Sequence, residues 1–552
     1  MKIAFIGDNS IQFLIKNFTS ICSECSVYEG LYNSIDTEIL NDTGELYNFE
    51  PDVIVIHESY FTFQEIFYSI FDDEKKSNFY NQKSQRLLDL FSFVKSNLPN
   101  VKFIYPLIHE YDDSVFGTYS LKVNKSLLYQ IRKYNNIIID FASDHDDFLL
   151  IHPINYKDST LDNNNNLYYN ADLHFSLEYI SFLSDRIFQI VKSLNAQMIK
   201  CIVLDLDNTL WGGTVGEDGP MGIKVSGQGE GKFYRKFQLW LRQLKERGIV
   251  LAVCSKNDDH IAKEPFQINS EMILKLDDFA LFIANWENKA DNITLIKETL
   301  NIGYDSILFV DDNPAEREIV LQKLPTVVVP DLSEDFTDTL DYLIRKNYFE
   351  IRSISDNDKN RTGQYKAEFE RVKLKSNYSS IDDYLKSLNM IAKLSSFTVE
   401  DAERISQLSL RSNQFNLRTI RYSKDEILNI IKSDSYYTCS LRLRDKFGDH
   451  GLVAIAIVKL DEKHEAFLDS LLMSCRVLKR GVEAYLMNKI IEELKEKSVH
   501  NLIGEYLPTT KNGLVQNFFT DHQFQYSPEN KLYSIKIDQF KTIRNYINES
   551  TN

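Results

Sequence analysis

The chain has 552 residues, of which 43% are hydrophobic, and its 63 Lys and Arg against 80 Asp and Glu give a formal net charge of -17. This length exceeds what one hydrophobic core organises, so we expect about three domains. The negative charge argues against a general nucleic-acid-binding protein, which would present basic surface to phosphates. The sequence has no signal peptide and no apolar run long enough to span a membrane, so we expect a cytoplasmic protein without a membrane partner.

The first expected domain comprises residues 1–196, where short apolar runs alternate with helical patterns. We expect buried strands at KIAFIG, PDVIVIH and VKFIYPLI, and a helix at SQRLLDLFSFVKSNL. This alternation predicts an α/β layered domain.

Two cysteines in this first domain, Cys22 and Cys25, form a Cys-x-x-Cys pair. The sequence has no second pair that would complete a zinc site, and its six cysteines are too scattered for a disulfide framework. We interpret both as structural thiols rather than as a metal or redox centre.

The stretches GDNS and ADLH of the first domain resemble a degenerate SGNH hydrolase. Asn9 stands where that family has its serine, and Asp172 is only two positions before His174. One hypothesis is a hydrolytic triad of Ser10, Asp172 and His174. The other is that the domain docks a partner or acts as a scaffold.

Residues 197–340 restart the alternation and predict a doubly wound parallel sheet. The strands expected here are KCIVLDLD, IVLAVCSKND and SILFVDDNPAE. Gly248 is placed to end the amphipathic helix FYRKFQLWLRQLKERG, a glycine also ends ADNITLIKETLNIG, and a further helix begins at Pro314.

Charged side chains follow these strands. Asp205 and Asp207 come after the first strand, and Asp311 and Asp312 after the last. Because the carboxyl ends of parallel strands share one edge, both pairs are expected around one crevice. Oxygen ligands suit magnesium, so we expect a magnesium site there.

Ser255 ends another strand at this edge, and Lys289 comes just before a helix. A nucleophile, a divalent ion and donors for phosphoryl oxygens are the components of phosphoryl transfer. The order of these motifs resembles the haloacid dehalogenase (HAD) superfamily. The resemblance implies that Asp205 is the nucleophile; that Asp207 is the acid and base and offers its backbone carbonyl to the metal; that Thr209 and Asn257 support the turn and phosphate site; that Ser255 and Lys289 hold phosphoryl oxygens; and that Asp311 and Asp312 complete the metal site.

The short spacings between these motifs leave no room for a sizeable cap domain. We therefore expect a capless HAD-type domain with an open crevice that admits a partner or carrier protein. The glycines that follow Asp207 suit a flap with tight turns, and a simple hairpin is equally compatible; they are Gly212, Gly213, Gly216 and Gly219.

A charged helical connector is expected at 341–378, followed by an α+β domain at 379–552. Two long strand patterns, YYTCSLRLRDKFGDHGLVAIAIVKL and AFLDSLLMSCRVL, precede the helix GVEAYLMNKIIEELKEK. We place a turn at Gly448 to Gly451.

Cys475 lies beside basic residues and shortly before the expected start of a helix. This environment favours the thiolate form of a cysteine. The following turn resembles the pantetheine loop of GCN5-related acyltransferases (GNAT), but Val482 stands where a second glycine is usual. We interpret Cys475 either as a nucleophilic thiolate or as a small buried residue that fills the sheet. Candidates for contact with a phosphopantetheine arm or an acidic carrier protein are Arg476, Lys479, Arg480, Gly481, Arg411 and Arg418.

Taken together, the motifs resemble the FkbH-like family, on the stretches VLDLDNTLWGGTVGEDG, CSKND, NWENKADNI, FVDDNPAER, RSNQFNL, FGDHG and MSCRVLKRGVE. The resemblance implies transfer of a glyceryl group from 1,3-bisphosphoglycerate to an acyl carrier protein through a cysteine thioester. Both phosphates are lost, one when a thiol attacks the acyl phosphate and the other by magnesium-dependent dephosphorylation in the HAD domain. We favour Cys475 over Cys254 as the acyl-carrying thiol, and His450 is a candidate base. The alternatives are a magnesium-dependent HAD phosphatase, or a coenzyme A-dependent acyltransferase in polysaccharide or secondary-metabolite tailoring.

Overall fold

The computed structural model describes the whole chain except residues 112, 114, 153–167, 171, 334, 352–362, 364–366, 368–370, 372–373, 375–377, 379, 413, 462–463, 475–476, 510–511 and 551–552, together with the side chain of residue 411. The chain forms two compact units: Met1–Lys192 with Asp341–Glu350, and Ser193–Leu340 with Ile351–Asn552. The stretch Asp341–Glu350, which we assigned to the connector, therefore groups with the first unit.

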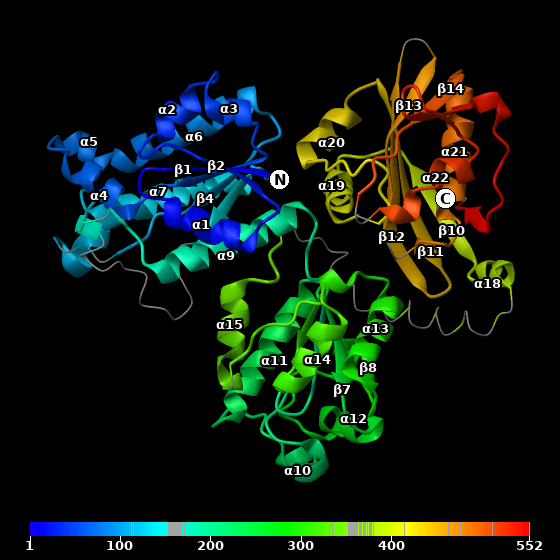
Figure 1. The fold of residues 1–552 in the computed structure, drawn as a ribbon, viewed down its shortest axis with the longest axis horizontal. Helices are drawn as coiled ribbons and strands as arrows, with labels where there is room; N and C mark the ends of the chain where they lie inside the picture. Colours follow the sequence, from blue (N-terminus) through cyan, green and yellow to red (C-terminus); the bar gives the residue numbers. More distant parts are fainter. Residues whose placement is uncertain are drawn as a thin grey trace. The chain divides into compact units, whose positions relative to one another are not determined.

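The first unit contains a five-stranded parallel sheet with helices on both faces (Figure 1). Its strands run in the order β2-β1-β3-β4-β5, with bounds β1 (Lys2–Gly7), β2 (Ser26–Glu29), β3 (Val53–His57), β4 (Lys102–Pro106) and β5 (Phe148–Ile151). The helices α1 (Gln12–Ile21) and α9 (Leu177–Leu194) cover one face. The other face is covered by α2 (Ile35–Leu40), α3 (Glu45–Phe49), α4 (Tyr60–Tyr68), α6 (Phe79–Asn97) and α7 (Leu127–Ser143), and α5 (Asp73–Ser77) precedes α6.

The predicted strands and helix of this unit are confirmed. Strand β2, of sequence SVYE, carries too few apolar residues to stand out in the sequence. Cys22 and Cys25, which we interpreted as thiols, form a disulfide just after α1. Their spacing in that turn brings the two Cα atoms to 5.7 Å, within bonding range.

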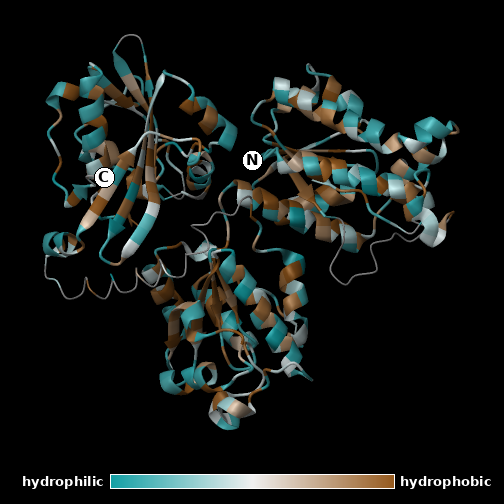
Figure 2. Cartoon of the chain, turned by 180° about the vertical axis from the view of Figure 1, so that it is seen from behind, coloured by the Kyte–Doolittle hydropathy of each residue, from teal (hydrophilic) through white to brown (hydrophobic). Residues whose placement is uncertain are grey.

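The second sheet has four parallel strands in the order β8-β7-β6-β9, which confirms the doubly wound prediction. The strands are β6 (Cys201–Leu204), β7 (Val250–Ser255), β8 (Phe279–Ala284) and β9 (Ile307–Val310). The helices around them are α11 (Gly231–Glu246), α12 (Asp259–Ile268), α13 (Lys289–Leu300) and α14 (Pro314–Lys323). Figure 2 shows the hydrophobic residues concentrated in the strands.

Two details of this sheet's helices can be compared with the sequence. The predicted start at Pro314 is confirmed, because Asn313 caps α14 through the N–H of Ala315 at 2.9 Å. The predicted end of α13 at a glycine is wrong. Asn301 ends that helix with φ of 49°, a left-handed conformation that Asn tolerates.

The connections of this sheet confirm the capless prediction. Between β6 and β7 lie α10 (Val215–Gly222) and α11, and between β7 and β8 lie α12 and a short 3-10 turn (Leu276–Asp278). Every residue in these connections is described, and none of them forms a further sheet. Gly213, in the flap that leads to α10, has φ of 90°, and a Cβ there would lie 2.4 Å from Asp218 Oδ2, so this turn requires glycine.

The third sheet has eight strands and confirms the α+β prediction. Its order is β15-β16-β14-β13-β12-β11-β10-β17, antiparallel except for the pairs β13–β14 and β10–β17. The strands are β10 (Met390–Ser395), β11 (Tyr436–Asp445), β12 (Gly448–Leu460), β13 (Glu465–Met473), β14 (Asn501–Gly504), β15 (Gln525–Ser527), β16 (Leu532–Lys536) and β17 (Ile547–Glu549). The helices are α18 (Ile381–Ser387), α19 (Ala402–Arg411), α20 (Lys424–Ile431), α21 (Val482–Glu496) and α22 (Phe518–Asp521). A further helix, α15 (Thr339–Lys346), lies mostly in the stretch that groups with the first unit.

The predicted turn at Gly448 to Gly451 is wrong by a few residues. Asp445 pairs with Gly448 across the hairpin, so the turn consists of Lys446 and Phe447. The carboxylate of Asp445 accepts the N–H of Phe447 at 2.9 Å and holds this turn.

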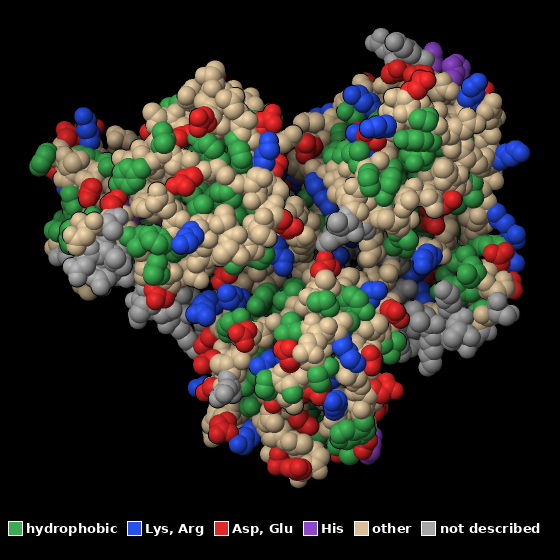
Figure 3. Space-filling view, viewed as in Figure 1, with side chains coloured by type: hydrophobic (Ala, Val, Ile, Leu, Met, Phe, Trp, Pro, Cys, Tyr) green, Lys and Arg blue, Asp and Glu red, His purple; other side chains and the backbone are tan. Residues whose placement is uncertain are grey.

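None of the described helices is both long and apolar enough to cross a membrane. On the face seen in Figure 3, acidic and basic side chains are interspersed.

Candidate active site

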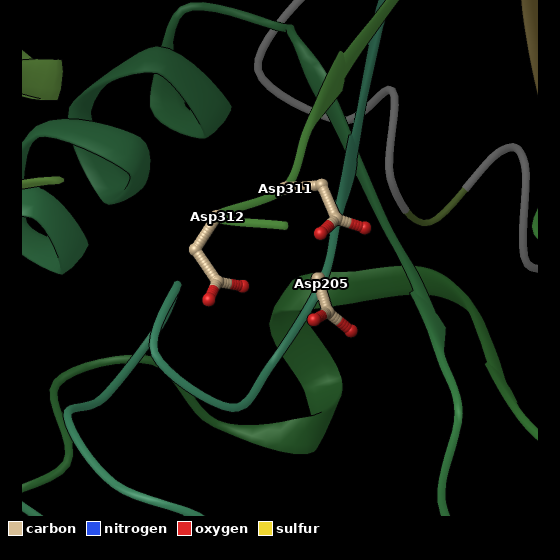
Figure 4. Close-up of side chains that lie close together, drawn as sticks. All are labelled: Asp205, Asp311 and Asp312. Carbon is tan, nitrogen blue, oxygen red and sulfur yellow. The ribbon is translucent and has the colours of Figure 1, made fainter. Parts of the chain in front are cut away.

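Three carboxyl groups meet at the carboxyl edge of the four-stranded sheet. Asp205 directly follows β6, and Asp311 and Asp312 directly follow β9, the parallel neighbour of β6. One carboxylate oxygen from each residue lies within 4.8 Å of the other two. Figure 4 shows these three side chains at the ends of their strands.

The ammonium group of Lys289 neutralises part of this charge. Lys289 begins α13 and is 3% exposed. Its Nζ donates to Asp311 Oδ2 at 2.6 Å and lies 3.1 Å from Asp205 Oδ1 as an ion pair. That Asp205 oxygen is buried, and apart from this ion pair it has no hydrogen bond within the described part of the chain.

The pKa values reflect an excess of negative charge. Burial and the neighbouring Asp205 raise the pKa of Asp311 to about 7, and the same two causes raise the pKa of Asp312. Burial lowers the pKa of Lys289, but Asp205 and Asp311 outweigh it and keep the ammonium charged. Three carboxylates that share one ammonium leave negative charge at this edge, which fits a small divalent cation with oxygen ligands such as magnesium.

Asp207 lies beside this cluster, and its carboxylate is held by the flap. Oδ1 accepts hydrogen bonds from Trp211 Nε1 at 2.8 Å and from the N–H of Val215 at 2.9 Å, and Oδ2 accepts from Asn257 Nδ2 at 3.2 Å. Burial raises the pKa of Asp207, and Asp205 adds to the rise. The side chain is therefore outside the three-carboxylate cluster, and its predicted metal contact was through the backbone carbonyl.

The turn after β9 is held by two residues. Thr209 is fully buried, and its Oγ1 accepts the N–H of Asp312 at 3.1 Å and lies 3.3 Å from Asp312 Oδ1. Arg317 donates at 2.8 Å to the carbonyl oxygens of both Asp311 and Asp312. Thr209 was expected from the sequence, whereas Trp211 and Arg317 were not. A tryptophan immediately after the aspartate motif, whose indole N–H needs an acceptor when buried, is a signal that could have indicated Trp211.

Ser255 and Cys254 are neighbours at the end of β7 with different surroundings. Ser255 is the last residue of the strand and lies at the same sheet edge as Asp205. Cys254 is fully buried against α13, with Sγ 3.7 Å from the carbonyl oxygen of Lys289. Burial raises the pKa of this thiol to about 12, which disfavours the thiolate and argues against Cys254 as the acyl-carrying group.

The predicted acyl-carrying thiol, Cys475, lies outside the described residues, as do two predicted carrier-binding groups, Arg476 and the side chain of Arg411. Lys479 is exposed, and Gly481 precedes α21 with φ of 78°. Arg480 is 4% exposed, with NH1 3.4 Å from Asp445 Oδ2.

The contact of Arg418 with a carrier protein stays a prediction, but its guanidinium is already paired within its own domain. Its guanidinium donates to Glu505 at 2.8 Å and to Asp469 at 2.6 Å, and it lies over the ring of Phe467 at 5.0 Å. Two carboxylates from the same domain neutralise its charge, a pairing that the local sequence did not reveal.

His450 lies in a buried charged network. Its Nε2 is 3.1 Å from Asp445 Oδ2 and 3.3 Å from Arg480 NH1. Arg371 holds both oxygens of Asp445, at 2.7 and 2.8 Å. Burial lowers the pKa of His450. A catalytic base at this position stays a prediction.

In the first unit, the histidine of the predicted triad contacts a different serine. His174 Nδ1 lies 2.6 Å from Ser59 Oγ, and Nε2 lies 2.8 Å from Asp172 Oδ1. In the part of the chain that is described, no hydrogen bond joins Ser10 to either residue. The Ser10 triad is therefore wrong as written, because Ser59, 115 positions before His174, takes the place of Ser10.

One family model and several solved structures are similar to parts of this chain. Residues 2–192 match the family model described as FkbH, N-terminal domain. The crystal structure of the N-terminal part of protein BF1531 from Bacteroides fragilis, described as containing a phosphatase domain and complexed with Mg, is 37% identical. It covers 64% of this chain and 95% of that chain, with a TM-score of 0.60.

Solved acetyltransferases match a smaller share. The ribosomal-protein-S18-alanine N-acetyltransferase of Escherichia coli is 16% identical over 26% of this chain and 94% of that chain, with a TM-score of 0.21. A GNAT-family acetyltransferase of Staphylococcus aureus is 13% identical over 26% and 99%, with a TM-score of 0.22. No curated protein matches the chain.

Proposed function

Because this chain belongs to the FkbH-like family, we propose that it is an enzyme that moves a glyceryl group from 1,3-bisphosphoglycerate, or a related acyl phosphate, to an acyl carrier protein. The acceptor is the thiol of the carrier's phosphopantetheine arm, and both phosphates are released. The observation that carries the proposal is the cluster of Asp205, Asp311 and Asp312 around Lys289.

The phosphatase half of the reaction uses Asp205 as nucleophile. Its carboxylate attacks the phosphorus of the 3-phosphate monoester, and Asp207 gives a proton to the departing alkoxide. A water molecule, deprotonated by Asp207, then cleaves the aspartyl phosphate. The raised pKa of Asp207 suits this exchange of a proton. Magnesium, held by Asp205, Asp311 and Asp312, would supply charge neutralisation for the phosphoryl oxygens, as the magnesium complex of the Bacteroides fragilis protein suggests.

The acyl-transfer half needs a thiol. The thiolate of Cys475 attacks the acyl carbon of the acyl phosphate, the bond to the phosphate oxygen breaks, and inorganic phosphate leaves. The carrier thiol then attacks the resulting thioester and restores the cysteine. The buried thiols Cys254 and Cys439 suit this step poorly, because burial raises the pKa of each to about 12.

A magnesium-dependent phosphatase without acyl transfer is the second candidate. It is favoured by Arg418, one of the expected carrier-binding cations, whose charge is already paired with Asp469 and Glu505.

Intact-protein mass spectrometry of the full chain, incubated with magnesium and 1,3-bisphosphoglycerate, tests the proposal. Wild type is expected to carry a glyceryl adduct that Cys475→Ala lacks. Asp205→Asn is expected to carry a phosphoglyceryl adduct instead, because its second dephosphorylation is lost.

Cys254→Ala and Cys439→Ala are the matched cysteine controls and should keep the adduct. Loss of the adduct only in Cys254→Ala would place the acyl chemistry in the crevice of the four-stranded sheet. Phosphate release with no adduct on any variant would support the plain phosphatase.

A further inference from the structure

A second group of polar side chains lies at the carboxyl edge of the five-stranded sheet. The strand order reverses direction between β1 and β3, the topological switch point at which open parallel sheets bind ligands. Asn9 lies two residues after β1 and His57 ends β3, and Asn9 Nδ2 is 3.2 Å from His57 Nδ1. Ser59 lies two residues after β3, and its N–H donates to Asp8 Oδ1 at 2.9 Å.

At this edge a hydroxyl, an imidazole and a carboxylate stand in series. His174 joins Ser59 on one ring nitrogen, at 2.6 Å, and Asp172 on the other, at 2.8 Å. Tyr32 donates to the second oxygen of Asp172. A nucleophile in contact with a base that a third group orients is the arrangement of nucleophilic hydrolases. Ser59 is fully buried and the Asp172 side chain is 45% exposed, so the series runs from the interior to the surface.

The position of Ser59 before a helix adds to this arrangement. Ser59 caps α4, and its Oγ accepts the N–H of Phe61 at 3.1 Å. The positive end of the helix therefore lies beside the serine oxygen and favours negative charge in its vicinity.

Two buried polar atoms near the serine lack hydrogen-bond partners within the described residues. They are Asn9 Oδ1 and His57 Nε2, in residues that are only 1% and 4% exposed. Buried polar atoms are ordinarily hydrogen-bonded, so these two point to a polar ligand group. Aromatic rings complete the surroundings: Phe175 lies 4.8 Å from the ring of His57, and Phe61 5.5 Å from that of His174.

We propose that Ser59 is the nucleophile of a second catalytic site, which cleaves a carboxylic ester or thioester independently of Asp205. Ser59 Oγ forms a bond to the acyl carbon while His174 accepts its proton. The bond from carbon to the leaving oxygen or sulfur breaks, and the leaving group takes that proton. Water then releases the acyl group from Ser59 as a carboxylic acid and restores the hydroxyl.

Labelling of the full chain with diisopropyl fluorophosphate, a small probe suited to a buried serine, tests this proposal. Ser59 Oγ forms the bond to phosphorus, and fluoride leaves. Wild type is expected to carry the label on Ser59, mapped by peptide mass spectrometry. Ser59→Ala is expected to lose it, and His174→Gln to slow labelling on the order of 10²-fold.

Ser10→Ala is the matched serine control and should label at the wild-type rate, as should Asp205→Asn, which separates this site from the proposed phosphatase. Because Ser59 caps a helix, the melting temperature of Ser59→Ala is measured, and His174→Gln supplies the test if that variant does not fold. A label on Ser10, no label on folded wild type, or a Ser59 label whose rate is indifferent to His174→Gln would overturn the proposal.

Discussion

The carboxyl edges of the two parallel sheets differ in how their buried carboxylates are paired with cations. At the four-stranded sheet, the carboxylates of Asp205, Asp311 and Asp312 face the single ammonium of Lys289, so negative charge is left over. At the five-stranded sheet, buried Glu58 is matched by Arg86 at 2.8 Å and Lys83 at 3.7 Å, and burial together with Glu58 raises the pKa of the neighbouring Asp8 to about 7, toward its neutral form. Buried charge without a sufficient counter-charge indicates a cation-binding site, whereas matched charge indicates a stable framework around the polar groups beside it.

The largest expected effect comes from removing the ammonium of Lys289, which pairs with two of the clustered carboxylates. Lys289→Met leaves Asp205 and Asp311 buried without a counter-charge, which we expect to cost about 3–5 kcal/mol of unfolding free energy. Chemical denaturation without magnesium measures this loss. Added magnesium should restore part of it, because it would neutralise the same carboxylates.

Lys263→Met is the matched control, since Lys263 pairs with Asp259 at the surface. Its unfolding free energy should change by less than about 1 kcal/mol. A Lys289→Met protein as stable as wild type in the absence of magnesium would contradict the charge imbalance on which the comparison rests.

The two edges also differ in how far the sequence predicts them. Asp205, Ser255 and Asp311 lie at or directly after the ends of buried strands, so one strand pattern and the geometry of a parallel sheet place them together. Ser59 and His174 meet across 115 positions, and nothing near Ser59 in the sequence marks it. The histidine and the aspartate of this series were therefore predicted from the sequence, but the predicted serine, Ser10, was wrong.

The same reasoning explains the other differences. Arg418 looked like a free cation because Asp469 and Glu505, which pair with it, lie on other strands or beyond their ends. Arg317 was not expected because it binds backbone carbonyl oxygens, and a motif of reactive side chains does not reveal such contacts.

A pH titration tests the ion pairing of Glu58 at the carboxyl edge of the five-stranded sheet. Burial raises the pKa of Glu58, but Lys83, Arg86 and the hydroxyl of Tyr105 outweigh it and bring the pKa down to about 2. A carboxyl whose pKa is lower in the folded state stabilises the fold above its unfolded pKa, about 4.3, and this contribution is lost as the pH falls toward 2. Glu58→Gln should cost about 2–4 kcal/mol at neutral pH and remove that part of the acid sensitivity.

Denaturation curves between pH 2 and 7 measure this difference. Glu74→Gln, an exposed carboxylate in α5, is the control and should follow wild type at every pH. If Glu58→Gln loses stability in parallel with wild type as the pH falls, Glu58 is not the group that titrates, and the balanced description of this edge fails.

The smallest expected effect tests whether the flap tunes the unbalanced edge. Trp211 is fully buried and donates to Asp207 Oδ1, one of three donors that hold this carboxylate in its ionised form. Trp211→Phe keeps most of the buried ring and removes this donor, so the pKa of Asp207 should rise further. Phosphatase activity should fall by about 10-fold or less, because Asp207 keeps its other two partners. The basic limb of the pH–rate profile, which reports the pKa of Asp207 as the general acid, should shift to higher pH. Trp240→Phe, on α11, controls for loss of an indole and should leave that profile unchanged. An unchanged profile in Trp211→Phe would contradict this prediction. The indole would then only pack beneath the flap, and its hydrogen bond would not set the pKa of Asp207.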